Sequence, residues 1–152
     1  MHHRPRLIAL AGLLAGAGTL SACSSSVDVS VADKASSPWC AKAAAQWPTT
    51  VSGEKSREVS VKSPTVHAWG DPAIIARCGV TSPGATSRQC FGVSGVDWVG
   101  TTLSDGMSFV TYGREPAIEV LVPKDYSPEP LVLGAFTKAA SAIPQGPHRC
   151  SA

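Results

Sequence analysis

Hydrophobic and polar residues alternate along the middle of the chain. Between residues 57 and 122 the period is two: Val59 and Val61 alternate with polar neighbours, and residues 118–122 repeat the pattern. Such alternation predicts strands that bury one face. Further short β-prone runs lie at 73–78, 90–93, 96–103 and 107–112.

A hairpin is the most specific local prediction. Ser104-Asp105-Gly106 separates the run at 96–103 from the run at 107–112. Because Asp-Gly between β-prone segments favours a tight turn, we expect these two runs to pair antiparallel.

Two segments have helical rather than strand periodicity. Ser37 and Pro38 suit the start of a helix that ends before Pro48. Residues 131–143 return to helical spacing and are followed by Pro144. The order helix, strands, helix predicts an α+β fold: an antiparallel sheet of four to five strands, with an N-terminal and a C-terminal helix, in two layers. Residues 38–152 would form this single domain.

The N-terminal residues predict export and lipidation. Arg4 and Arg6 precede an uncharged run over residues 7–20, as in a secretory signal. Leu20-Ser21-Ala22-Cys23 then matches a bacterial lipobox. We therefore expect residues 1–22 to be a lipoprotein signal peptide and Cys23 to carry lipid on the outer face of the cell membrane. Simple secretion, with an unmodified Cys23, is the alternative.

Residues 23–37 are rich in Ser, Asp and Ala and predict a flexible tether after the lipidated cysteine. A coil of this length has a root-mean-square reach of roughly 20 Å. The membrane, contacted through the N-terminal lipid, is the first expected partner.

Charge argues against a nucleic-acid partner. The signal segment holds two of the 13 basic residues, so the mature chain has 11 basic against 11 acidic residues. Nucleic-acid binding needs a basic face that displaces counterions from phosphates, and this chain offers no such excess.

Four cysteines remain besides Cys23: Cys40, Cys78, Cys90 and Cys150. An even number in an oxidising compartment predicts two disulfides, for which three pairings are possible. We expect Cys78 to pair with Cys90, closing a short loop, and Cys40 with Cys150, joining the ends of the domain.

The candidate chemistry is a polar cleft with an aromatic wall. Aromatic faces give apolar contact while charged groups fix the orientation of a sugar or peptide. The residues that could form it are Trp69, Asp71, Arg77, Asp97, Trp98 and Arg114. Four of them also have a structural reading: Trp69 and Trp98 as core residues, Asp71 as a turn residue, and Arg114 either in an ion pair with Asp97 or Asp71 or as a solvated turn residue.

Three ordered motifs carry a resemblance to a known family: Trp69-Gly70-Asp71-Pro72, Gly95-Val96-Asp97-Trp98 and Gly113-Arg114-Glu115-Pro116. Together with the four cysteines they resemble an uncharacterised family of actinobacterial exported proteins and lipoproteins, a domain of unknown function. The resemblance implies a secreted or membrane-anchored location and a shared fold, and it brings no catalytic residues.

Because neither the motifs nor the resemblance assigns an activity, we infer a function by elimination. The leading hypothesis is a non-catalytic binding or scaffold module of the cell envelope, whose partner is an envelope protein or a small ligand. The alternatives are a small hydrolase of glycan or peptide, with Asp71 or Asp97 as acid/base and His67 in support, or a subunit of an envelope complex. The sequence predicts no catalytic set, no metal and no cofactor, since His67 and His148 lie far apart and the cysteines are expected in bridges.

Overall fold

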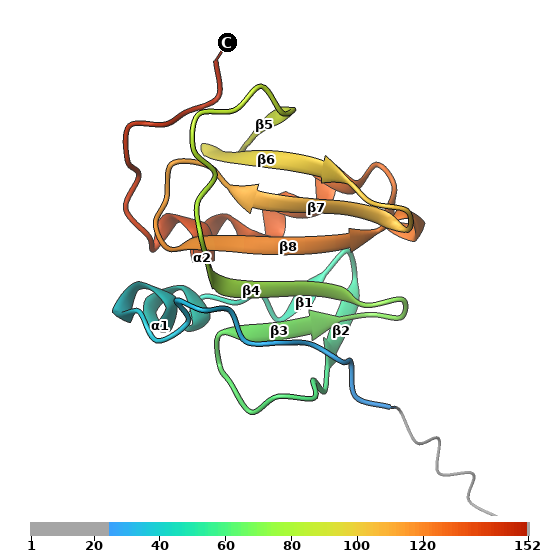
Figure 1. The fold of residues 1–152 in the computed structure, drawn as a ribbon. Coiled ribbons are helices and arrows are strands. Elements are labelled where there is room, and N and C mark those ends of the chain that lie inside the picture. The colour runs from blue at the N-terminus through green and yellow to red at the C-terminus, as the bar shows by residue number, and fades with distance from the viewer. Residues whose placement is uncertain (1–24, 152) are drawn as a thin grey trace, which may run out of the picture.

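The computed structural model describes residues 25–151, which form one antiparallel sheet and several short helices (Figure 1). The sheet has eight strands in the order β1-β2-β3-β4-β8-β7-β6-β5. The strands are β1 (Thr50–Val51), β2 (Glu54–Arg57), β3 (Val66–Trp69), β4 (Ile74–Val80), β5 (Cys90–Val93), β6 (Val96–Thr102), β7 (Gly106–Thr111) and β8 (Ala117–Pro123).

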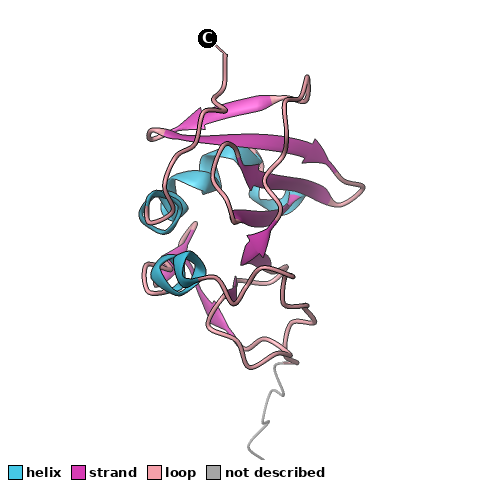
Figure 2. Cartoon of the chain, turned by 60° about the vertical axis from the view of Figure 1, so that its left-hand side comes forward, coloured by secondary structure: helices cyan, strands magenta, loops and turns pink. Residues whose placement is uncertain are grey.

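The helices supply one wall of a single hydrophobic core, and Figure 2 shows them gathered on one side of the sheet. They are the α-helices α1 (Pro38–Ala44) and α2 (Thr137–Ser141) and the 3₁₀ helices η1 (Lys124–Tyr126) and η2 (Glu129–Phe136). Among the described residues, no helix has the length and apolar character needed to cross a membrane.

The α+β class and the antiparallel sheet are confirmed, but the predicted four to five strands are too few. Strands β1, β2 and β3 were missed. In β3, three of four residues are buried, so the strand has no alternation to detect. Val59 and Val61 do not form the predicted strand: Val59 makes only an isolated bridge to Val27.

Two predictions that depend on local hydrogen bonding, the hairpin at 104–106 and the helix start at Ser37, are confirmed. The hairpin joins β6 and β7, and Leu103 N donates to Gly106 O at 2.9 Å. At the start of α1, Ser37 Oγ accepts a hydrogen bond from Trp39 N at 3.3 Å. Both signals depend on contacts within a few residues, which sequence spacing fixes directly.

The predicted C-terminal helix over residues 131–143 is shorter and less regular. The structure has the 3₁₀ helix η2 followed by the five-residue α2. Pro130 lies in the first turn of η2, where a proline is tolerated, whereas Gly134 lies inside the predicted helix and disfavours a continuous α-helix. The chain still covers the sheet here, because Val132, Leu133 and Phe136 are buried.

Two disulfides are present, but the predicted pairing is wrong. Cys40 pairs with Cys78 and Cys90 pairs with Cys150, with Cα–Cα distances of 5.4 and 5.6 Å. Cys40 lies on α1 and meets the core-facing Cys78 of β4. Cys90 lies on β5 at the far edge of the sheet, where it holds the C-terminal segment.

The predicted flexible tether is wrong for residues 27–37, which pack against the domain. Val27 N donates to Glu58 O and Ser60 N donates to Val27 O, both at 2.9 Å, and Lys34 N donates to Gly79 O at 2.9 Å. We call residues 27–37 the N-terminal strap. The predicted signal peptide and Cys23 lie outside the described residues.

Candidate functional site

The predicted aromatic cleft does not form. Trp69 and Trp98 have no exposed surface and belong to the core, which agrees with their structural reading. Trp69 Nε1 donates to Pro48 O at 3.0 Å, and its ring packs edge-on against Phe136. Neither indole can therefore form the wall of a ligand cleft.

The two candidate acids lie in separate parts of the fold. Asp71 is in the exposed turn after β3, 3.1 Å from Arg57, whereas Asp97 is on β6 and accepts from Cys150 N at 3.0 Å. Strands β3 and β6 are four places apart, about 19 Å at a spacing of about 4.8 Å. Paired glycosidase carboxylates lie within about 9.5 Å, so the geometry that the hydrolase hypothesis needs is missing.

His67 does not support Asp71 as an orienting partner. Its Nε2 lies 2.6 Å from Ser56 Oγ, and its ring packs against Trp69 with centroids 4.6 Å apart. Burial lowers the pKa of His67. This histidine is a packed residue at the edge of the core face rather than part of an acid/base pair.

Arg114 is buried, with 6% of its surface exposed, and the predicted ion pair to Asp97 or Asp71 is absent from the part of the chain that is described. Its guanidinium instead donates to the backbone oxygen of Ile143. Burial and the nearby charge of Arg149 lower the pKa of Arg114, partly opposed by Asp97. Arg114 therefore holds the C-terminal segment in place.

Arg77 is the one predicted cleft residue that lines an open groove. It projects from the face of the sheet opposite the helices, where its Nε donates to Glu119 Oε2 at 2.6 Å. Ser108 Oγ donates to the second oxygen, Glu119 Oε1, at 3.2 Å. Arg77 Nη1 donates to Ser30 Oγ of the strap at 3.0 Å. A polar network in the middle of this face thus holds both the guanidinium and the strap.

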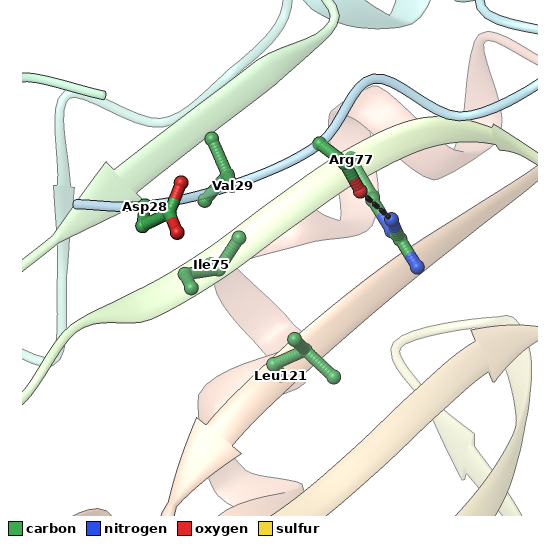
Figure 3. Close-up of a pocket in the computed structure, with 6 residues that line it drawn as sticks. Asp28, Val29, Ile75, Arg77 and Leu121 are labelled. Carbon is green, nitrogen blue, oxygen red and sulfur yellow. Dashed lines mark hydrogen bonds between the residues drawn. The ribbon is translucent and has the colours of Figure 1, made fainter. Parts of the chain in front are cut away.

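The groove lies between the strap and the sheet and has a volume of about 350 Å³. Its lining residues are Asp28, Val29 and Ser30 of the strap, Ile75 and Arg77 of β4, and Leu121 of β8. Figure 3 shows Asp28 and Arg77 at opposite ends, with Ile75 between them and Leu121 on the neighbouring strand. We call this pocket the strap groove.

The strap is also fixed beyond the groove. Lys34 Nζ lies 2.5 Å from Glu115 Oε1, and Glu115 Oε2 accepts from Ser82 N at 2.8 Å. Burial alone would raise the pKa of Glu115, but the hydrogen bonds from Lys34 and Ser82 and the charge of Lys34 together lower it. Glu115 is thus held ionised as a link between the strap and the loop before β8.

The comparison with protein families agrees with the resemblance seen in the sequence. A family model described as "Protein of unknown function (DUF3515)" matches residues 6–147. The chain belongs to this family. The actinobacterial source and the secretion that the resemblance implied remain predictions. No curated protein and no solved structure matches the chain.

Membership of this family assigns no chemistry to the strap groove, so the groove must be read from its own residues. Within residues 25–151 there is no cluster of three or more His, Cys, Asp or Glu side chains placed to hold a metal ion. The groove instead combines an apolar floor with one carboxylate and one guanidinium. This composition suits the binding of a small amphipathic molecule.

Sequence reasoning missed Asp28 and Ser30 because it assigned them to a tether. A signal was present: Val27, Val29 and Val31 alternate with polar residues, as in a strand. The segment is too short and too polar for that alternation to outweigh its Ser and Asp content.

Proposed function

We propose that this protein is a lipid-anchored binding module on the outer face of the cell membrane, without catalytic activity. The observation that carries the proposal is the docking of the N-terminal strap, which builds one wall of the strap groove. The chain between the predicted lipid attachment site and the ordered domain is therefore short.

The length of that connection can be bounded. Cys23 and Val27 are four residues apart, and an extended chain spans at most about 3.6 Å per residue, or about 14 Å. Val27 is itself hydrogen-bonded to the domain. A lipid on Cys23 would thus hold the domain close to the headgroups and restrict its orientation, whereas a free tether would let it rotate.

The disulfides support an extracytoplasmic location. Both bridges, Cys40–Cys78 and Cys90–Cys150, persist only where thiols are not kept reduced. This support is independent of the lipobox, since it depends on different cysteines.

Binding is favoured over hydrolysis by how the charged groups are used. Glu119 accepts from both Arg77 and Ser108, and Asp97 accepts from a backbone amide. These carboxylates stabilise the fold, and Asp71 lies on an exposed turn away from Asp97. An acid/base pair has no support in this arrangement.

A subunit of a larger complex has less support. Among the described residues, the exposed large hydrophobic side chains are Val31, Leu103 and Leu131, which come from the strap, the β6–β7 turn and η2. A dedicated protein interface is expected to show a contiguous apolar patch.

The proposal is tested by intact mass and fractionation of the protein expressed in a bacterium that processes lipoproteins. The wild-type protein should begin at Cys23, carry a diacylglyceryl group and stay in the membrane fraction after a salt wash. Cys23→Ser should lose both the added mass and the membrane retention, while Ser21→Ala, a conservative change within the lipobox, should keep them. An unmodified Cys23 in the wild-type protein would refute the anchor.

A further inference from the structure

The charges in the strap groove are arranged for a ligand that carries both signs. Asp28 and Arg77 line the same groove, yet they form no ion pair with each other, since the ion pairs of the described chain are Lys34–Glu115, Arg57–Asp71 and Arg77–Glu119. Figure 3 shows them at its two ends with apolar side chains between them. A dipolar molecule can therefore meet a carboxylate at one end and a guanidinium at the other.

The guanidinium is fixed and still has donors to offer. Arg77 Nε is bonded to Glu119 and one Nη1 donor to Ser30. A guanidinium has five N–H donors, and within residues 25–151 its Nη2 has no hydrogen-bond partner. Glu119 and Ser30 thus orient Arg77 while leaving donors for an anionic oxygen, which guanidinium groups bind well.

The Asp28 carboxylate is likewise held in place, and it can accept further hydrogen bonds. Asp28 Oδ1 accepts from Ser60 Oγ at 3.2 Å, and Oδ2 has no partner in the described part of the chain. Asp28 is exposed, so a cation can reach it. The floor between the two charges is formed by Ile75 and Leu121, which are half-buried.

The position of the groove relative to the membrane identifies the ligand. Asp28 is five residues after Cys23, a distance of at most about 18 Å along an extended chain. If Cys23 carries lipid, as proposed above, the groove lies within reach of the bilayer surface. Molecules with a phosphate, an ammonium group and an apolar part are abundant there as phospholipids.

We infer that the strap groove binds the headgroup of an aminophospholipid, with the phosphate on Arg77, the ammonium group on Asp28 and the glycerol and first acyl carbons on Ile75 and Leu121. The volume of about 350 Å³ is at the low end for small-molecule sites, so the groove takes one headgroup and little of the chains. The lipid anchor and the bound headgroup together would fix the domain at two points on the membrane.

The test uses the mature lipidated protein in uncharged detergent micelles, titrated with short-chain dihexanoyl phosphatidylethanolamine. Methyl signals of Ile75 and Leu121 should shift and saturate. Dihexanoyl phosphatidylglycerol, which has the phosphate but no ammonium group, should bind more weakly. Phosphoethanolamine alone should also bind more weakly, because it lacks the apolar part.

A matched pair of strap variants isolates the ammonium contact. Asp28→Asn keeps an oxygen for Ser60 and should weaken binding of phosphatidylethanolamine about two- to five-fold, the range of an exposed ion pair, without weakening phosphatidylglycerol. Asp33→Asn removes another exposed carboxylate of the strap, outside the strap groove, and should change neither affinity. Leu121→Ala, on β8, should weaken both lipids.

Two results would overturn the inference: no saturable shift at Ile75 and Leu121, or equal effects of Asp28→Asn on both lipids. Loosening of the strap would itself be visible as loss of hydrogen-exchange protection at Lys34 N, and Leu121→Ala tests the groove without altering the strap. Because the short-chain lipids are added from solution, failure here leaves the mass and fractionation test of the anchor unaffected. If the anchor test fails instead, the same titration of Cys23→Ser, which cannot carry the lipid, still tests the groove.

Discussion

The two faces of the sheet are built on different principles. The face covered by α1, η2 and α2 is apolar, and its largest side chains have no exposed surface: Trp69, Trp98, Phe109 and Phe136. The Cys40–Cys78 disulfide crosses from helix to sheet within this core. Such packing determines whether the chain folds at all.

The opposite face is polar at its centre and only partly covered. Arg77, Glu119 and Ser108 form a network on this face, whereas the helix-covered face is lined by apolar side chains. The strap is held there by hydrogen bonds and by the Lys34–Glu115 ion pair. Exposed contacts such as the Lys34–Glu115 pair contribute about 1 kcal/mol or less each, whereas the partly buried Arg77–Glu119 bond contributes more. We therefore expect the strap to detach at a lower free energy than that needed to unfold the helix face.

The largest expected difference between the faces is in their disulfides. Replacing Cys40 and Cys78 by Ala should lower the free energy of unfolding by about 4 kcal/mol from chain entropy, plus the loss of packing, because both residues have no exposed surface. The Cys90–Cys150 bridge spans 60 residues and is also expected to contribute about 4 kcal/mol by the same entropic model, but both its cysteines are half-buried and one lies near the C-terminus.

Chemical unfolding of two double variants, one with Cys40 and Cys78 replaced by Ala and one with Cys90 and Cys150 replaced by Ala, measures this difference. Loss of Cys40–Cys78 should be the more damaging, and peptide mapping without reductant should recover the Cys40–Cys78 and Cys90–Cys150 peptides. Equal destabilisation would mean that the packing on the helix face adds nothing to the bridge.

Docking of the strap can be broken at Gly79. This residue has φ of +116°, and a Cβ there would lie 2.4 Å from Ala35 N. Gly79→Ala should therefore release the strap and cost about 2 to 3 kcal/mol, from backbone strain together with lost contacts. Hydrogen exchange of residues 27–37 is the direct measurement.

Gly53 provides the control, because its φ is +80° and a Cβ would meet nothing within 4 Å. Gly53→Ala should lose stability through backbone strain alone, and the strap should keep its hydrogen-exchange protection. If the strap of Gly79→Ala also stayed protected, the contact with Ala35 would not be what holds it.

A smaller effect is expected from the polar network. Glu119→Gln removes the charge facing Arg77, and hydrogen bonds to charged groups contribute about 1.5 to 3 kcal/mol when partly buried. Since the Arg77 and Glu119 side chains are 28% and 15% exposed, we expect a loss near the lower limit, measured by urea unfolding. Glu58→Gln, at an exposed side chain, should change stability by less than about 0.5 kcal/mol.

The elements predicted correctly from the sequence depend on neighbouring residues. The Ser104-Asp105-Gly106 hairpin, the Ser37 cap and the alternation in β8 all depend on contacts within a few positions. The existence of two disulfides followed from an even cysteine count in a chain that the sequence predicts to be exported.

The features that were missed depend on contacts between distant segments. The partner of Cys40 depends on α1 packing over β4, and the docking of the strap depends on Gly79, more than 40 residues away. The candidate cleft joined residues by their chemical type, but β3 and β6 lie four strands apart, so Asp71 and Asp97 could not meet. Of the six candidates only Arg77 lines the strap groove.

The smallest expected difference between the two faces is in how their stability responds to acid. His67, beside Trp69 at the edge of the helix face, has a pKa lowered by burial, so the folded state binds its proton less tightly than the unfolded state. Stability should therefore decrease as the pH falls below about 6.5, the unfolded pKa. The pKa of Glu115, on the strap face, is lowered, so protonation of this carboxylate should reduce stability only as the pH falls below about 4.5.

Thermal unfolding at pH 7.5 and 5.5 measures the effect of His67. The wild type should show a modest decrease in stability at pH 5.5. His67→Gln should remove this decrease, and His148→Gln, at an exposed side chain, should retain it. If His67→Gln kept the full decrease between these two values, the helix face would not be the acid-sensitive one.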